Sequence, residues 1–237
     1  SIVGLWAIQN KFLETFLHTF IAIIYSAVFI RPDVLHVHAI GPAIFTPFAR
    51  LLGLKVVVTH HGADYDRQKW NALAKFILKT GEKMACKFAN KVIVVGRSLT
   101  LELQNKFPKR KNNIIFIPNG TLANFGFNCV KSDLPKDLSV LSDSYILAVA
   151  RLVPEKGLHD LIKAFNHSEA PHKLVIVGDA DHDDEYSRQI KNEASDKVVI
   201  AGRRSGIELQ SLYKFARVFV LPSYHEGHPI VALEAIS

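Results

Sequence analysis

The segment with the clearest chemistry carries two cations around a turn. Arg151 and Lys156 lie between an apolar run that ends at Ala150 and a helical stretch that begins at Gly157. An arginine offers a planar fork of donors, a lysine offers a point charge, and the first N–H groups of a helix add partial positive charge. Together these groups predict an anion site that suits a diphosphate. Two solvated loop cations are the alternative interpretation.

Two carboxylates follow in a second segment. Glu226 lies in a predicted loop, and Glu234 lies within the helix that this loop enters. We expect both to face one pocket and to accept hydrogen bonds from sugar and ribose hydroxyls, although most exposed glutamates are only solvated surface. The start of that helix adds a further contact for an anion or a hydroxyl, made by Gly227, His228, Pro229 and Ile230.

The histidines raise the question of a metal site. His36 and His38 share one strand face, and His60 and His61 follow a neighbouring strand. Zinc needs a closed ligand set, and nothing here fixes a third or fourth ligand. The acidic run Asp179–Glu185 is interpreted as a loop with a negatively charged helix start, which the helix dipole favours. We therefore predict neither a metal nor a cofactor.

Apolar, β-branched runs alternate with helix-length segments, as expected for an α/β protein whose parallel strands are covered on both faces. The predicted strands are Val34–Ala39, Lys55–His60, Lys91–Gly96, Asn113–Pro118, Tyr145–Ala150, Lys173–Gly178, Lys197–Gly202 and Arg217–Pro222. The predicted helices are Lys11–Phe29, Arg67–Asn90, Gly157–Asn166, Asp184–Glu193 and Ile207–Phe215.

An irregular polar stretch, Asn119–Ser144, divides these strands into two groups of four. We expect a Rossmann-like domain over residues 1–130, a linker over 131–143 and a second Rossmann-like domain over 144–237. Ligands of such sheets bind beyond the carboxyl ends of the strands. The residues there are unusual for surface loops, and they include His38, His61, Arg151, Gly178, Gly202 and Arg203.

The composition and charge narrow the class of protein. With 237 residues and 49% hydrophobic content, the chain is globular. Its net charge of +7 is uneven, because residues 1–130 hold 16 Lys and Arg against 6 Asp and Glu. The two cysteines, Cys86 and Cys129, lie far apart, which fits a reducing cytosol. The apolar stretch Phe16–Ile30 is too short and too polar for a membrane crossing.

A row of lysines lies within the basic half. Lys75, Lys79, Lys83, Lys87 and Lys91 recur at every fourth position in a predicted helix, preceded by Arg67 and Lys69. Such spacing places like charges on one helix face, and Glu82 relieves only part of their repulsion. The face is either solvated surface or a docking site for an anionic membrane leaflet, where each cation contributes about 1 kcal/mol.

These segments together closely resemble the retaining glycosyltransferases built from two Rossmann-like domains, the GT-B fold, and specifically glycosyltransferase family 4, the group 1 transferases. The stretch Leu5–Trp70, which includes Asn10–Thr19, is similar to the rhamnosyltransferase-type members. The family resemblance rests on the order and spacing of Pro32–His38, Val58–Gly62, Ile117–Gly120, Ala150–Gly157, Leu174–Asp179 and Glu226–Glu234.

The resemblance implies a role for each matching residue. Arg151 and Lys156 are expected to neutralise the diphosphate of a nucleotide sugar. Glu234 then accepts the ribose hydroxyls, Glu226 and the amides near Gly227 hold the sugar, and His61 lies beside the reacting carbon. Gly178, Gly202 and Arg203 belong with the donor-binding residues, the last two near the base.

The implied mechanism keeps the anomeric configuration. The acceptor hydroxyl attacks on the face of the leaving group, and a donor phosphate oxygen takes its proton. The protein supplies alignment and charge stabilisation and needs neither a nucleophile of its own nor a metal. The family resemblance further implies a saccharide or lipid-linked acceptor in surface polysaccharide synthesis. From the cysteines and the lysine row we expect a cytoplasmic protein that can lie on the inner face of the membrane.

The sequence also departs from the family pattern. Members begin with a strand and a glycine-rich loop that are not visible here, and this sequence ends soon after Glu234, so we interpret it as a fragment truncated at both ends. A nucleotide-sugar epimerase of the same fold is one alternative function. A basic binding module for nucleic acid is another, but the basic half lacks aromatics interleaved on a strand platform, so we expect no nucleic-acid partner.

Overall fold

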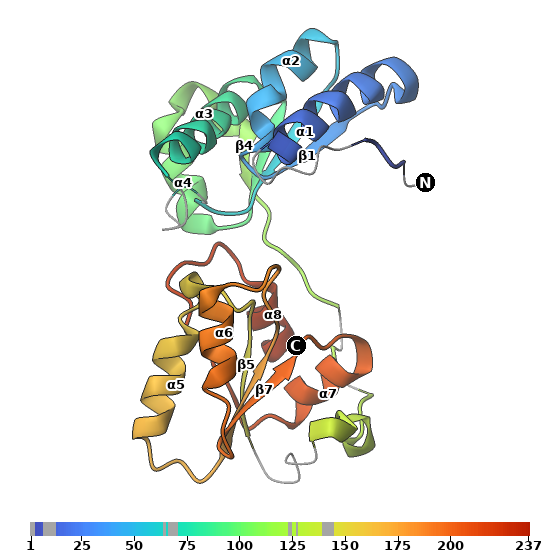
Figure 1. Ribbon diagram of the computed structural model, residues 1–237. Helices are drawn as coiled ribbons and strands as arrows, with labels where there is room; N and C mark the ends of the chain where they lie inside the picture. The colour runs from blue at the N-terminus through green and yellow to red at the C-terminus, as the bar shows by residue number, and fades with distance from the viewer. Residues whose placement is uncertain are drawn as a thin grey trace. The chain divides into compact units, whose positions relative to one another are not determined.

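The computed structural model describes residues 3–6, 13–63, 65, 71–122, 125–126, 128–138 and 145–237. Lys11, Arg67, Lys69 and residues 139–143 of the predicted linker lie outside the described residues. The chain divides into two compact units, Ser1–Asn119 and Gly120–Ser237 (Figure 1). Each unit is a parallel sheet with helices packed against it, which confirms the predicted α/β class.

The N-terminal sheet has the strand order β1-β2-β3-β4, and all pairs are parallel. Its strands are β1 (Leu35–His38), β2 (Val56–His60), β3 (Lys91–Val94) and β4 (Ile114–Phe116). Its helices are α1 (Leu13–Tyr25), which continues as a π-turn over Ser26–Ile30, α2 (Thr46–Leu51), α3 (Ala72–Phe88) and α4 (Arg97–Lys106).

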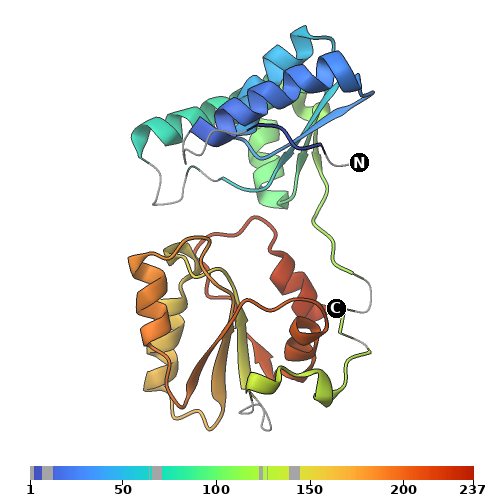
Figure 2. The ribbon, with the colours of Figure 1, turned by 45° about the vertical axis from the view of Figure 1, so that its right-hand side comes forward.

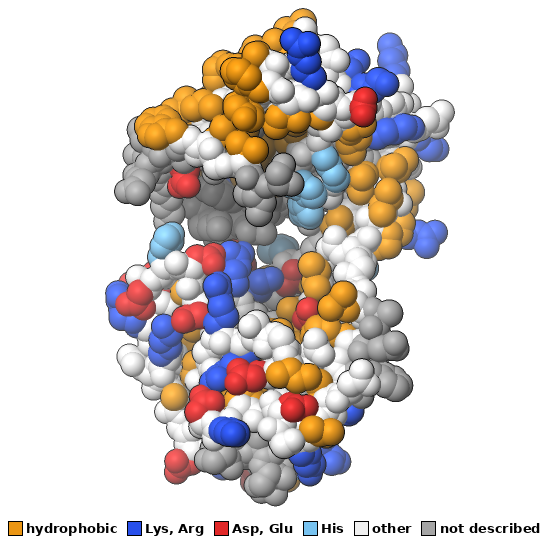
Figure 3. All heavy atoms as spheres, turned by 90° about the vertical axis from the view of Figure 1, so that its right-hand side faces the viewer, with side chains coloured by type: hydrophobic (Ala, Val, Ile, Leu, Met, Phe, Trp, Pro, Cys, Tyr) orange, Lys and Arg blue, Asp and Glu red, His pale blue; other side chains and the backbone are white. Residues whose placement is uncertain are grey.

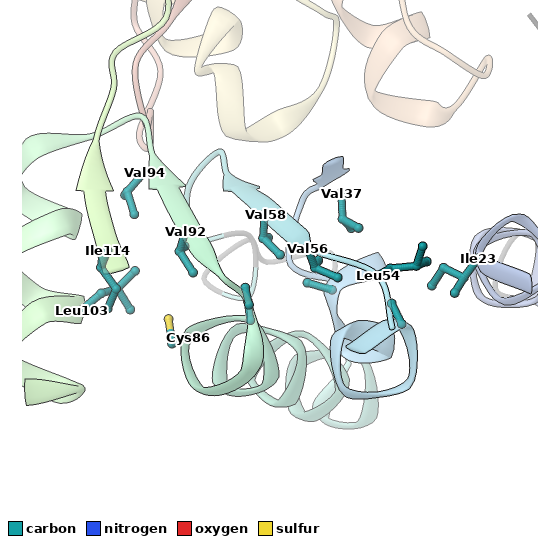
Figure 4. Packing of buried hydrophobic residues seen from close by; sticks show 14 residues of the cluster. Ile23, Val37, Leu54, Val56, Val58, Cys86, Val92, Val94, Leu103 and Ile114 are labelled. Atoms are coloured by element: carbon teal, nitrogen blue, oxygen red, sulfur yellow. The ribbon is translucent and has the colours of Figure 1, made fainter. Parts of the chain in front are cut away.

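This order places the helices of the N-terminal unit on one side. Each strand is added next to the previous one, so right-handed crossovers leave the connecting helices on the same face. Val56, Val58, Val92 and Val94 point into that face and form one core with α3 and α4 (Figure 4). Within the described ranges, α1, α2, α3 and α4 all contribute to this one core.

The C-terminal sheet has the strand order β7-β6-β5-β8, again parallel throughout. Its strands are β5 (Tyr145–Val149), β6 (Lys173–Val177), β7 (Val198–Gly202) and β8 (Val218–Phe219). Its helices are α5 (Leu158–His167), α6 (Glu185–Asn192), α7 (Gly206–Phe215) and α8 (Ile230–Ile236).

The winding of the C-terminal sheet reverses, and this covers both of its faces. The chain runs outward from β5 to β7 and then returns to place β8 on the other side of β5. Helices α5 and α6 lie on one side of the sheet and α7 lies on the other (Figure 2). One core contains Leu158 and Ile162 of α5 with Ile190 of α6, and the other contains Leu212 of α7. The carboxyl ends of β5 and β8 therefore form the switch point where ligands of such sheets bind.

The segment before β5 belongs to the C-terminal unit. Lys214 Nζ donates to the backbone oxygen of Cys129 at 2.7 Å, and Ser211 Oγ donates to that of Asp133 at 3.1 Å. Both lysine and serine lie on α7, so the irregular segment is held against this helix. Residues 120–130, which the sequence assigned to the first domain, thus fall within the second compact unit.

Two residues of the predicted basic helix, Lys91 and Glu82, lie in other surroundings than the sequence predicted. Lys91 begins β3 and donates to the backbone oxygen of Asn112 at 3.0 Å, so it does not continue the lysine row of α3. Glu82 is fully buried and pairs with Lys106 of α4, so it does not lie on the face of α3 that carries the lysine row. None of the helices in the described ranges is both long and apolar enough to span a bilayer.

Candidate functional site

The two cations of the predicted anion site lie at the switch point. Arg151 follows β5, and Lys156 ends a single 3₁₀ turn, Pro154–Lys156, before α5. The loop that follows β8 carries Glu226. Because β5 and β8 are hydrogen-bonded neighbours, both segments leave the sheet at the same edge.

Gly157 allows these two segments to approach each other closely. Its φ is +63°, and a Cβ atom at this position would lie 2.4 Å from the backbone oxygen of Pro222. The backbone N–H of Tyr224 donates to the backbone oxygen of Glu155 at 3.1 Å. A glycine is therefore required where the turn after β5 meets the loop after β8.

Lys156 and Glu226 bind each other. Lys156 Nζ lies 2.6 Å from Glu226 Oε1, and the two side chains are 19% and 23% exposed. The resemblance assigned these residues to the diphosphate and to the sugar of one ligand. The structure thus brings the two residues together as an ion pair, in which each neutralises the charge of the other.

Arg151 also has a partner, which the sequence analysis missed. Its Nη1 lies 2.7 Å from Asp181 Oδ2, and Arg203 Nη2 lies 3.9 Å from the other oxygen of Asp181. The hydrogen bond and the charge of Arg151 lower the pKa of Asp181. The sequence shows that a carboxylate lies in the loop after β6, but the spacing of the residues does not show which cation it pairs with.

Three other aspartates of the acidic run also have partners. Asp179 pairs with Lys191 at 3.0 Å, and Asp183 pairs with Arg188 at 3.1 Å. Asp184 caps α6 by accepting from the backbone N–H of Ser187 at 2.8 Å. Within the described ranges, no group of three or more His, Cys, Asp or Glu side chains is placed to hold a metal ion.

Glu234 has a different environment from Glu226. It lies on α8, and Tyr213 Oη of α7 donates to its Oε2 at 3.0 Å. Burial raises the pKa of Tyr213, and the nearby carboxylate raises it further, so the phenol remains a donor to Glu234. Tyr213 was not predicted as a site residue, because only the packing of α7 against α8 brings it there.

The predicted glycine and helix-start residues are placed as follows. Gly178 directly follows β6 and Gly202 ends the neighbouring β7, and the N–H of Gly178 donates to the backbone oxygen of Gly202 at 2.8 Å. Helix α8 begins at Ile230, with Pro229 at its N-cap and without a side-chain cap, slightly later than the sequence predicted. Gly227 and His228 precede it in the loop.

The histidines of the N-terminal unit point to two sides of its sheet. His36 and His38 are exposed on the open face, where histidine side chains gather (Figure 3). His38 Nδ1 lies 3.1 Å from His61 Nε2, and His36 Nε2 lies 2.7 Å from Thr59 Oγ1. Burial, and then the proximity of His38, lower the pKa of His36. His60 faces the helices and is fully buried.

Both units match known families. Residues 131–237 match the family described as glycosyl transferases group 1, and residues 5–121 match glycosyltransferase family 4. The chain belongs to these glycosyltransferases. The predicted family and the predicted GT-B fold class are thereby confirmed.

Curated proteins similar to this chain come from an archaeon and from bacteria. It is 36% identical over 155 residues to an uncharacterized glycosyltransferase of Methanocaldococcus jannaschii, covering 62% of this chain and 40% of the relative. It is 30% identical to a UDP-Gal:alpha-D-GlcNAc-diphosphoundecaprenol alpha-1,3-galactosyltransferase of Escherichia coli, covering 86% and 55%. The chain thus spans about half the length of the curated relatives it matches.

Solved structures share the fold. Sucrose-phosphate synthase from Thermosynechococcus elongatus matches with a TM-score of 0.76 at 21% identity, covering 99% of this chain and 61% of the other. Anabaena HepE in complex with UDP-glucose matches with a TM-score of 0.72 at 18% identity, covering 92% and 60%. At these identities the likeness concerns the fold.

The end of β6 provides a test of the site's framework. Gly178 has a φ of +138°, and its Cβ would lie 1.9 Å from the backbone oxygen of Ala150. We expect Gly178→Ala to destabilise the C-terminal unit by roughly 2–4 kcal/mol, because alanine disfavours this backbone conformation and its Cβ would clash with the backbone of Ala150. Amide hydrogen exchange of β5 and β6 measures this opening free energy.

Gly202→Ala is the matched control for that change. Gly202 also has a positive φ, +68°, but a Cβ there would meet nothing within 4 Å. Its cost should be only the left-handed backbone, about 1–2 kcal/mol. Equal losses in the two variants would contradict the close approach of Gly178 to Ala150.

Proposed function

We propose that the complete protein is a retaining glycosyltransferase that transfers a hexose from a nucleotide diphosphate sugar to a saccharide or lipid-linked acceptor in surface polysaccharide synthesis. The observation that carries the proposal is the pair of cations, Arg151 and Lys156, at the switch point of the C-terminal sheet. The names of the relatives support the substrate class, since one acts on a diphosphoundecaprenol-linked sugar and one solved relative holds UDP-glucose.

Donor binding exchanges the partners of these cations. The diphosphate replaces Asp181 at Arg151 and Glu226 at Lys156, and charge-assisted contacts to phosphate are stronger than the exposed Arg151–Asp181 pair. Glu226, released from Lys156, then accepts hydrogen bonds from the sugar hydroxyls. Glu234, oriented by Tyr213, accepts from the ribose.

Transfer forms one C–O bond and breaks another. The acceptor oxygen bonds to the anomeric carbon on the face that the diphosphate leaves, and the acceptor proton passes to the departing phosphate oxygen. Arg151 and Lys156 stabilise the charge that develops on the diphosphate. For His61, the family resemblance proposes a contact with the sugar near the reacting carbon.

Removing either cation tests the donor site. We expect Arg151→Ala and Lys156→Ala each to lower turnover by about a hundredfold, since a lost charge-assisted contact costs about 2–3 kcal/mol. Glu234→Ala should mainly weaken nucleotide binding, because ribose contacts are alike in the ground and transition states. Steady-state kinetics and calorimetric titration with nucleoside diphosphates measure the two effects.

Three controls make this test specific. Lys163→Ala removes an exposed cation of α5 and should leave turnover unchanged. Tyr213→Phe removes only the hydrogen bond to Glu234 and should weaken nucleotide binding less than Glu234→Ala. Asp181→Asn should strengthen nucleotide binding up to about fivefold, because it removes a competitor for Arg151. Near-normal transfer by both cation variants would refute the assignment.

Metal independence is a second expectation. Two cations already serve the phosphates, and Asp179, Asp181 and Asp183 are each paired with a basic side chain. Transfer in excess EDTA should therefore equal transfer with Mg²⁺ within about twofold. A loss of activity that Mn²⁺ restores would assign the acidic run a catalytic function instead.

We further propose that α3 docks the enzyme on an anionic membrane leaflet at the cytoplasmic side. Lys79, Lys83 and Lys87 are exposed, and Lys75 is half-buried. Two apolar side chains of the same helix are also exposed, Leu73 by 66% and Phe76 by 68%. A helix surface with both kinds of side chain suits a lipid headgroup region.

Cosedimentation with vesicles tests the docking. Binding should require anionic lipid, weaken as salt increases, and fall at least tenfold when Lys75, Lys79, Lys83 and Lys87 are replaced by Gln. A variant with the same loss of charge in the C-terminal unit should still bind, and its replaced residues are Lys131, Lys136, Lys163 and Lys197. Equal binding to neutral vesicles, or equal loss in both variants, would reduce the lysine row to ordinary surface.

A further inference from the structure

A carboxylate is buried in the core of the N-terminal unit. Glu82 lies on α3 with a side chain only 1% exposed. Its Oε2 accepts from Tyr65 Oη at 2.9 Å and lies 3.3 Å from His60 Nε2. Its Oε1 lies 2.6 Å from Lys106 Nζ of α4. One carboxylate therefore joins the end of β2, a residue beyond it and two helices.

Glu82 is ionised in this environment. Burial opposes ionisation, but hydrogen bonds from His60, Lys106 and Tyr65 outweigh it and lower the pKa of Glu82 to about 2. Lys106 supplies the balancing charge, and its side chain is half-exposed. A buried ion pair is a poor way to gain stability compared with apolar packing. Its presence therefore calls for another reason.

The hydrogen bonds of His60 determine its tautomer. The backbone N–H of Gly62 donates to His60 Nδ1 at 3.3 Å, so Nδ1 carries no proton. The ring proton is then on Nε2, where it is donated to Glu82. Both nitrogens of the buried ring are thereby used, one by α3 and the other by the turn that follows β2.

This arrangement constrains the neighbouring residue. Gly62 has a φ of +149°, and its N–H is held by His60. His61 lies between these two residues and reaches the opposite side, where its Nε2 lies 3.1 Å from His38 Nδ1. The direction of the His61 side chain therefore depends on a turn that the His60 ring holds through its hydrogen bond with the N–H of Gly62.

We propose that Glu82 is a positioning residue, which acts through His60 to hold the His61–Gly62 turn in one conformation. The consequence for transfer rests on the proposed function, because it requires His61 to contact the sugar. The effect of Glu82 on the tautomer of the His60 ring does not rest on that function. Tyr65 donates to the same oxygen as His60 and Lys106 donates to the other oxygen, so the carboxylate is held in one orientation toward His60.

The first test needs no substitution. Long-range ¹H–¹⁵N NMR spectra of the complete protein, labelled at histidine nitrogen, distinguish the two neutral tautomers and the charged ring. The signal of His60 is assigned by its loss in His60→Gln. At pH 7 we expect His60 to be neutral with its proton on Nε2. A charged ring or a proton on Nδ1 would overturn the proposal even if no variant folds.

Glu82→Gln gives the directional test. The amide has one oxygen, and Lys106 is the charged donor that claims it, so the NH₂ group faces His60. The ring must then accept at Nε2 and carry its proton on Nδ1, which breaks the bond from Gly62. We expect the tautomer to change and exchange of the Gly62 N–H to accelerate at least tenfold.

A second substitution should reverse this change. In Glu82→Gln combined with Lys106→Met, the amide oxygen is free to face His60, and the original tautomer should return. Glu102→Gln, an exposed substitution on α4, is the isosteric control and should change neither signal. If His60 keeps its proton on Nε2 in Glu82→Gln, the carboxylate does not set the ring and the proposal is wrong.

Kinetics connect the ring to transfer. We expect Glu82→Gln to lower kcat roughly tenfold to a hundredfold while the donor KM changes little, and the double variant to recover most of kcat. If Glu82 only stabilised the fold, the double variant would not regain both kcat and the original tautomer of His60. If the unaltered protein transfers no sugar, the proposed function fails, whereas the NMR result stands or falls independently.

Discussion

The reversal of winding at β5 is the constraint on which the C-terminal unit depends. Because β8 returns to the free side of β5, the segment after β5 and the loop after β8 leave the sheet together. Gly157 lets these segments touch, and Gly178 does the same between the ends of β5 and β6. The segments that carry Arg151, Lys156 and Glu226 can approach their neighbours closely because the backbone has no side chain at these two points.

Two ion pairs neutralise most of the charge of this site. Lys156 pairs with Glu226 and Arg151 pairs with Asp181, while Glu234 accepts a hydrogen bond from the neutral Tyr213. Such pairs keep the side chains in place at little cost in stability, since exposed ion pairs contribute about 0–1 kcal/mol. An anionic ligand therefore gains most of the energy of its own contacts with the cations. In the N-terminal unit a buried carboxylate is likewise held by polar partners, and we propose that it orients His60.

The strands and most helices could be predicted, because they depend on local patterns. All eight predicted strands are present, since buried parallel strands are continuous runs of Val, Ile and Leu. Helix α4 was missed because its sequence, Arg97–Lys106, is mostly polar and buries only Thr100 and Leu103. Helix α2 was missed because it is only 6 residues long and directly follows the short 3₁₀ helix Pro42–Phe45. The lysine row of α3 could be predicted from the sequence, but the burial of Glu82 on the same helix could not.

The sequence by itself determined the family, the α/β class and the residues that carry charge at the strand ends, because these depend on residue type, order and spacing. The tertiary structure alone decided which charges meet. Asp181 reaches Arg151 from the loop after β6, Tyr213 reaches Glu234 from α7, and Lys106 reaches Glu82 from α4. Each of these pairs spans about 20–30 residues, and a pairing over that distance depends on the order of the strands and the packing of the helices. No local pattern encodes such contacts.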